Sequence, residues 1–176
     1  IKDALAKLGV EYDKVQNSAA MRSPYSDKNE ESGTCVFAPM LCIYEEYDFP
    51  VLFTLFEYIG QEHLGVDSIV VRAGDYKYQY GIKDFVKLGS EEQKIKNRTV
   101  AVEYGMRVAT DYDYNMFMDI LSSKESIVRF SRLYHGEFAC QDYTITNEDR
   151  QAITDVINAY NLMCSVSPEV MRKALA

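Results

Sequence analysis

The sequence predicts an α+β fold: an antiparallel, strongly twisted sheet of about six or seven strands, with two main helices packed on it and short helices near the chain termini. Three observations support this prediction. From Thr34 onward the chain alternates apolar and polar residues and is rich in β-branched and aromatic side chains. Two hairpin turns are recognisable, and apolar residues after position 110 recur at helical spacing.

The length of the chain fits one domain. Its 176 residues can bury roughly 70% of the unfolded chain's surface, so disulfides or metals are not needed to build a core. We expect a short helix and a polar linker in residues 1–34 and a single α+β domain in residues 35–176. Residues 13–33 are poor in large aliphatic side chains and rich in Ser, Asn, Asp, Glu and Lys, which is typical of a loop or linker.

The first two predicted strands are residues 34–48 and 50–60. The second segment has enough Leu and Phe for a helix. Its β-branched and aromatic residues and the flanking Pro50 and Gly60 nevertheless favour a strand.

Two hairpins follow in the predicted sheet. Strands at 66–72 and 76–80 flank the turn residues Gly74 and Asp75, and strands at 126–131 and 136–146 flank a turn at His135 and Gly136. Between the hairpins, the polar residues 83–98 are predicted as an exposed connection, and residues 99–108 as another strand.

Two amphipathic helices and a short last helix complete the predicted fold. The first helix has apolar residues at helical spacing, namely Tyr114, Phe117, Met118 and Leu121. The second helix follows Thr146, a capping residue, with Asp149 at its third position. Its apolar face consists of Ile153, Val156, Ile157, Tyr160 and Cys164. Ser167 and Pro168 begin the last helix.

The net charge limits the kinds of partner. Asp and Glu number 27 against 19 Lys and Arg, which gives a net charge of -8. Such a surface repels phosphate backbones and anionic lipids, so we expect no nucleic-acid partner. No stretch approaches about 18 consecutive apolar residues, so no transmembrane segment is predicted.

Four cysteines occur, at positions 35, 42, 140 and 164. They allow two disulfides, but a chain of this size does not depend on them, and four reduced, mostly buried thiols are the simpler interpretation. Cys35 and Cys42 are seven positions apart on a predicted strand. Their side chains therefore point to opposite faces unless Pro39 bends the strand.

No metal or cofactor motif is complete. Asp111, Asp113 and Asn115 match the start of a calcium loop, but Met116 and Ser122 occupy the positions that need Gly and Glu. We interpret these residues as the start of a helix, where acids are favoured. The signatures of P-loop, dinucleotide-binding and acyl-transfer enzymes are absent from the sequence.

Candidate catalytic residues are few. The only histidines are His63 and His135. His135 lies five residues before Cys140, but Tyr134 and Gly136 flank it, so we interpret this segment as a turn rather than as part of a catalytic pair. Glu45 and Glu46 are adjacent on a predicted strand and face opposite ways, so they are interpreted as solvated residues.

Tyrosine is the most conspicuous feature of the composition, with 14 residues and no Trp. Tyr76, Tyr78 and Tyr80 alternate along a predicted strand and share one face. Such a stripe can bind a sugar or a peptide, or it can pack beneath a helix. Both interpretations are open, and these three residues are the candidate ligand-binding site.

Parts of the chain resemble uncharacterised bacterial domains, often exported or lipid-anchored, over about two thirds of its length. The matching positions in the first half are Pro50, Leu52, Tyr58, Ile59, Gly60, Val70, Arg72, Gly74 and Tyr78. Those in the second half are residues 120–122, 128–130, 144–146 and 159–160. Ser131 and Arg132 stand where the pattern has Gly. The resemblance implies a fold and an exported location, and no functional residue.

Function is therefore predicted only as a class. The first expectation is a noncatalytic binding or interaction domain of an exported bacterial protein, with a protein, peptide or carbohydrate as partner. The alternatives are a hydrolase with a carboxylate or Cys-based site and a structural assembly domain of a longer chain. We expect that an export leader preceded Ile1, and an extracytoplasmic location, although a cytoplasmic one stays open.

Overall fold

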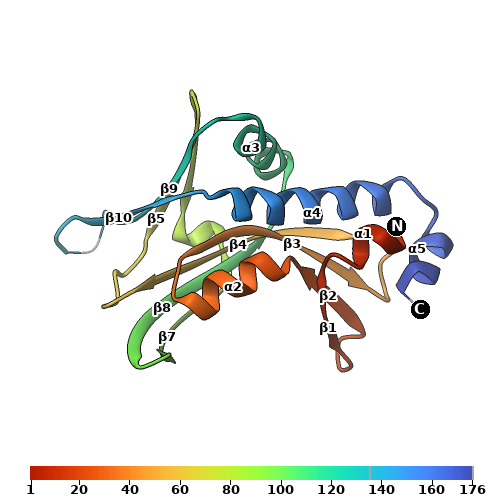
Figure 1. Cartoon of the computed structure of the whole chain (residues 1–176), viewed down its shortest axis with the longest axis horizontal. Helices are drawn as coiled ribbons and strands as arrows, with labels where there is room; N and C mark the ends of the chain where they lie inside the picture. Colours follow the sequence, from red (N-terminus) through yellow and green to blue (C-terminus); the bar gives the residue numbers. More distant parts are fainter. Residues whose placement is uncertain (135, 176) are drawn as a thin grey trace.

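The computed structural model describes residues 1–134 and 136–175 and confirms the α+β fold class. The predicted strands lie in two antiparallel sheets rather than in one. Figure 1 shows the two sheets and the helices that pack on them.

The larger sheet has six strands in the order β1-β2-β3-β4-β8-β7. Its strands are β1 (Gly9–Asp13), β2 (Ser18–Arg22), β3 (Val36–Tyr44), β4 (Val51–Gly60), β7 (Val86–Ile95) and β8 (Arg98–Val108). The sheet is strongly curled, because the β1–β2 and β7–β8 hairpins both project to the side of β3 and β4 that faces away from α4 (Figure 1). The curl gives this sheet a concave face.

The smaller sheet has four strands in the order β10-β9-β5-β6. Its strands are β5 (Ser68–Ala73), β6 (Tyr76–Gly81), β9 (Ser126–Arg132) and β10 (Ala139–Thr144). Both predicted hairpins are confirmed, and Gly74 and Asp75 form the turn of the first one. His135, predicted at the turn of the second hairpin, lies outside the described residues.

The described residues form five helices, of which α4 lies on the convex side of the six-stranded sheet. They are α1 (Lys2–Leu5), α2 (Pro24–Ser32), α3 (Asp111–Ser122), α4 (Asn147–Cys164) and α5 (Pro168–Leu175), with a 3-10 turn at Ile82–Asp84. Helix α4 packs on β3 and β2, and α1, α2 and α3 all contact α4. Among the residues described, no helix is long and apolar enough to cross a membrane.

Aromatic side chains connect these layers in the core. Phe37 of β3 lies 6.3 Å from Phe117 of α3, measured between ring centroids, and Phe56 of β4 lies 6.1 Å from Phe130 of β9. All four rings are fully buried. The core is therefore continuous from the six-stranded sheet to α3 and to the four-stranded sheet.

Two sequence-based predictions of irregular structure are wrong. Residues 13–33, predicted as a loop or linker, contain β2 and α2, and residues 83–98, predicted as a connection, contain β7. β7 is an edge strand with exposed polar side chains, so it lacks the apolar alternation of a half-buried strand. Helix α2 is polar, but it has a Ser23 cap, Pro24 at its first position and Gly33 at its end with φ of 78°.

The prediction for the start of α4 is confirmed. Thr146 caps the helix, and its hydroxyl accepts a hydrogen bond of 3.1 Å from the Asp149 amide. The Asp149 carboxylate in turn accepts from the Thr146 amide at 2.7 Å. The same buried carboxylate accepts from Asn29 of α2 at 2.7 Å and from Tyr143 of β10 at 2.6 Å. Asp149 therefore joins α2, β10 and α4.

We predict that Asp149→Ala lowers the free energy of unfolding by about 3 kcal/mol, because the donors of Asn29, Tyr143 and Thr146 lose their buried acceptor at once. Glu148→Ala is the matched control, since Glu148 lies in the same helical turn but is exposed. This control should change stability by less than about 0.5 kcal/mol. Urea unfolding measures both, and equal effects of the two variants would contradict the role of Asp149.

Candidate functional site

The three tyrosines of the predicted site do not form one exposed surface. Tyr76 is 61% exposed, whereas Tyr78 and Tyr80 are 8% and 1% exposed. Helix α3 covers the two buried rings: Tyr78 donates a hydrogen bond to Asp119, and the Tyr80 hydroxyl lies 3.2 Å from the sulfur of Met116. Burial and the bond to Asp119 raise the pKa of Tyr78 to about 12. The stripe thus packs beneath a helix at two of its three positions.

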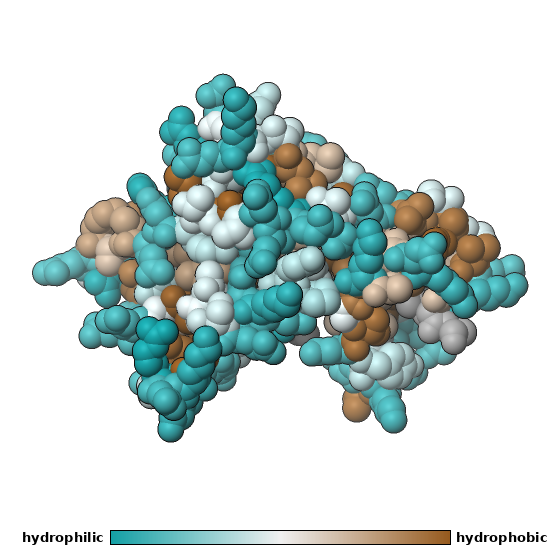
Figure 2. Space-filling model, viewed as in Figure 1, coloured by the Kyte–Doolittle hydropathy of each residue, from teal (hydrophilic) through white to brown (hydrophobic). Residues whose placement is uncertain are grey.

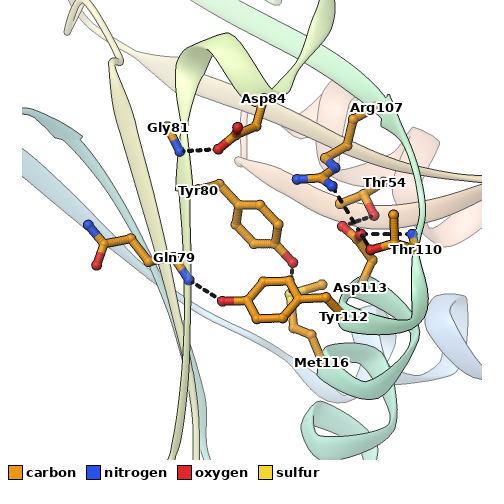
Figure 3. A network of polar contacts seen from close by, with 10 residues as sticks. All are labelled: Thr54, Gln79, Tyr80, Gly81, Asp84, Arg107, Thr110, Tyr112, Asp113 and Met116. Carbon is orange, nitrogen blue, oxygen red and sulfur yellow. Dashed lines mark hydrogen bonds and ion pairs between the residues drawn. The ribbon is translucent and has the colours of Figure 1, made fainter.

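Tyr112 of α3 packs against this aromatic cluster beside β6, an edge strand of the four-stranded sheet. Its ring centroid lies 4.9 Å from that of Tyr78 and 5.6 Å from that of Tyr80. Its hydroxyl accepts a hydrogen bond of 2.8 Å from the amide of Gln79 (Figure 3). Tyr112 therefore fixes the start of α3 against β6.

The run that resembles a calcium loop is the start of α3, as predicted. Asp113 is fully buried, and its carboxylate accepts from Thr54 at 3.0 Å and from the amide and hydroxyl of Thr110 at 2.9 Å each (Figure 3). Arg107 forms an ion pair with it at 3.5 Å and lies 5.2 Å from the centroid of the Tyr80 ring. These partners satisfy the carboxylate within the protein.

The other residues named from sequence are dispersed. Glu45 and Glu46 are exposed in the turn after β3. His63 lies near the hydroxyl of Ser90, with 3.1 Å between Nδ1 and Oγ, and Cys140 is exposed on β10. Cys35 and Cys42 are buried, as expected, whereas Cys164 is exposed like Cys140. Within the described part of the chain, no three His, Cys, Asp or Glu side chains converge as a metal site would require.

The concave face of the six-stranded sheet contains a cleft of about 550 Å³, which we call the concave cleft. Figure 2 shows the molecule hollowed between the two projecting hairpins, β1–β2 and β7–β8. Met40, Leu55, Val102 and Met106 provide an apolar floor from three adjacent strands. Tyr104 lies over Gly89 at the rim, where a Cβ atom on Gly89 would be 2.1 Å from the Tyr104 ring.

Charged side chains form one wall of the concave cleft. Arg22 of β2 contacts three carboxylates: Asp27 at 2.5 Å and Glu30 at 2.9 Å from α2, and Glu57 at 3.5 Å from β4. Glu11 of β1 and Glu91 of β7 also line the cleft. Among the residues that line the concave cleft, Arg22 is the only Lys or Arg, and carboxylates outnumber it.

Glu57 is the most perturbed acid of this wall. Its side chain is 15% exposed, and its Oε2 atom is buried with no hydrogen-bond partner among the described residues. Burial and the charge of Glu30 raise its pKa to about 7, although Arg22 opposes the shift. Glu57 can therefore accept a hydrogen bond from a bound molecule, or exchange a proton near neutral pH.

Sequence reasoning missed the concave cleft for a specific reason. Its charged wall includes Asp27 and Glu30 of α2 and Glu91 of β7, which lie in the segments predicted as linker and connection. The curl that brings these segments together is a long-range property of the sheet. The only local signal was the cap sequence of α2, from Ser23 to Gly33.

A second cleft, of about 860 Å³, lies where the end of β4 approaches β10. Its walls also include the β7–β8 turn and the C-terminal end of α2. We call it the edge cleft, because β10 is an edge strand of the four-stranded sheet.

We predict opposite outcomes for two tyrosine variants. Tyr78→Ser should lower the free energy of unfolding by about 3 kcal/mol, because it removes a buried ring, whereas Tyr76→Ser should change it by less than about 0.5 kcal/mol. Urea unfolding measures both. Equal, small effects would show that the stripe is a surface rather than part of the core.

The raised pKa of Glu57 predicts a pH dependence of stability. Between its ordinary value of 4.5 and about 7, the folded state binds a proton that the unfolded state does not. The free energy of unfolding therefore falls as the pH rises across this range, by up to about 3 kcal/mol for this group. Glu57→Gln should lose this component, so its stability relative to the wild type should be higher at pH 8 than at pH 5. Parallel pH profiles of the two proteins in urea unfolding would contradict the assignment.

Comparison with known proteins assigns no family and no function to this chain. No protein-family model, curated protein or solved structure matches the chain. The concave cleft and the edge cleft are therefore the basis on which function is proposed.

Proposed function

We propose that this chain is a noncatalytic ligand-binding domain, and that its site is the concave cleft. The ligand that best fits the cleft has an elongated apolar body and a cationic group. The observation that carries the proposal is Glu57 in the cleft wall: its side chain is 15% exposed, and its buried Oε2 atom has no hydrogen-bond partner among the described residues. A buried acceptor without a partner costs free energy, and a bound donor would recover it.

The charge of the concave cleft favours a cationic ligand over an anionic one. Five carboxylates line it, and Arg22 is the one Lys or Arg among the lining residues; the carboxylates are those of Glu11, Asp27, Glu30, Glu57 and Glu91. Three of these carboxylates already contact Arg22, which leaves its guanidinium little capacity for an added anion. An ammonium group near Glu57 would instead stabilise the charged carboxylate and lower its pKa.

The floor of the cleft supports an apolar body for the ligand. Leu55 and Val102 are buried, and Met40 and Met106 are partly exposed beside them. Methionine side chains adapt to ligands of different shape. Each methylene group that leaves water for such a surface contributes about 0.8 kcal/mol.

We expect octylamine to bind the concave cleft more tightly than octanol, which has the same chain and no charge. Binding of octylamine should strengthen from pH 5 to pH 8, because Glu57 becomes charged while the amine stays protonated. Glu57→Gln should weaken octylamine binding by about tenfold at pH 8 and leave octanol binding unchanged. Isothermal titration calorimetry measures each of these affinities.

Glu148→Gln is the matched control for this experiment, because it removes an exposed carboxylate at the start of α4, outside the cleft. It should leave both affinities unchanged. Equal affinities for octylamine and octanol, or no binding of either, would contradict the proposed ligand class.

A second candidate function is a hydrolase with a carboxylate site. The convergence of Glu57, Glu30 and Asp27 around Arg22 favours it, because a carboxyl group with a pKa of about 7 suits a general acid. Turnover of p-nitrophenyl glycosides or esters by the wild type, and its loss in Glu57→Gln, would favour this candidate over binding alone.

The exported, bacterial setting belongs to the same proposal. It is supported by the resemblance of strand and helix segments to uncharacterised exported domains. Export of the full-length gene product, measured by cell fractionation, tests it.

A further inference from the structure

The two edges of the four-stranded sheet differ in how their outward backbone groups are satisfied. On β6, the amide of Gln79 donates to the hydroxyl of Tyr112 at 2.8 Å, and the amide of Gly81 donates to the Asp84 carboxylate at 2.7 Å. Side chains therefore occupy this edge and prevent further strand pairing.

On β10, the direction of the backbone groups follows from two hydrogen bonds of its neighbour β9. The carbonyl of Ser126 accepts from Ile145, just beyond β10, whereas the carbonyl of Ser131 accepts from Asp67, just before β5. Backbone groups alternate between the two neighbours along an antiparallel strand. Cys140, which pairs with Ser131, therefore directs its own N–H and C=O away from β9.

The same alternation applies along β10. Asp142 pairs with Arg129 and Thr144 pairs with Ile127, so their backbone groups also point outward. No described residue forms a hydrogen bond with the outward N–H or C=O groups of Cys140, Asp142 or Thr144. Unlike β6, this edge can accept a further strand.

Space for such a strand exists beside Cys140. Cys140 lines the edge cleft, whose volume is about 860 Å³. The opposite walls are formed by Gly33 at the end of α2 and by the last residues of β4. Added strands lie about 4.8 Å from their neighbours, and a cleft of this size accommodates several residues of an extended chain.

The charge of the edge cleft differs from that of the rest of the molecule. Arg98 and Arg132 line it, in a protein with a net charge of -8. The side chain of Arg98 forms no ion pair or hydrogen bond with another described residue, and Arg132 donates only to the carbonyl of Glu137, at 2.9 Å. The one carboxylate in the lining is that of Glu62, so the cleft favours an acidic partner.

We propose that β10 binds an extended, acidic segment of another protein chain as an added strand of the four-stranded sheet. The outward backbone groups of β10 supply affinity, and Arg98 and Arg132 select acidic side chains. Exposed apolar residues at the end of the β9–β10 hairpin, Leu133, Tyr134 and Phe138, extend the contact surface. This interaction is independent of the concave cleft.

A display library of random peptides about eight residues long tests the proposal. Peptides selected on the wild-type protein should be enriched in Asp and Glu, and they should protect the amides of Cys140 and Asp142 from hydrogen exchange. Arg98→Gln should weaken their binding by about fivefold, and added salt should reduce that difference.

Two matched comparisons isolate the backbone pairing. Cys140→Pro removes an outward amide and should weaken binding by about tenfold, whereas Cys140→Ala keeps the amide and should bind like the wild type. Methylating alternate backbone nitrogens of a selected peptide gives the same test without changing the protein. Methylation of the nitrogens that face β10 should abolish binding, and methylation of those that face away from it should not.

Three results would overturn the proposal. The first is a selection that yields no binding peptide, and the second is equal tolerance of both sets of methylated nitrogens. The third is protection of the β10 amides in the protein alone together with dimerisation in solution, which would assign this edge to a second copy of the chain.

Discussion

The position of both clefts depends on one buried carboxylate, that of Asp149. It accepts hydrogen bonds from Thr146 at the start of α4, from Asn29 of α2 and from Tyr143 of β10. Burial and the bond to Asp149 raise the pKa of Tyr143 well above its usual range, so this tyrosine stays a donor at physiological pH. Helix α2 and strand β10 are thereby connected to the longest helix, and each of them lines a cleft.

The curl of the six-stranded sheet determines which of its residues can line a ligand-binding site. Its convex face is covered by α4 and by the four-stranded sheet, and polar groups there form internal contacts, as in the hydrogen bond that Thr54 donates to Asp113. The cleft on the concave face is lined by strand residues and by Asp27 and Glu30 of α2, and the side chain of Glu57 is 15% exposed there. A flat sheet would expose the same side chains without enclosing them. Curvature therefore turns a row of alternate residues into a cleft.

Most of the elements predicted correctly from sequence contribute to the core, whereas the largely exposed β10 was predicted from its hairpin turn. β3, β4, β5, β8, α3 and α4 carry apolar residues at strand or helix spacing, so periodicity identifies them. β7 and α2 carry charged residues instead, because β7 is an edge strand and α2 is short and exposed on one side. Periodicity also predicts that Tyr78 and Tyr80 share one face of β6. It does not predict that α3 covers this face, because α3 is distant from β6 in the sequence. The floor of the concave cleft lies on predicted strands, but the cleft was missed because Asp27, Glu30 and Glu91 of its charged wall lie on α2 and β7, which lack a periodic signal.

Helix α2 relates the two clefts to each other. Its first turns direct Asp27 and Glu30 towards Arg22 in the concave cleft, whereas Gly33 at its end lines the edge cleft. A polar helix of nine residues has little stability of its own, so its position must come from tertiary contacts. Asn29, in the middle of α2, supplies that contact through Asp149 and Tyr143. The interaction of Asn29 with Asp149 and Tyr143 thus positions both the carboxylates of the concave cleft and the α2 wall of the edge cleft. The two clefts nevertheless have proposed ligands of opposite charge, a cation for the concave cleft and an acidic peptide segment for the edge cleft.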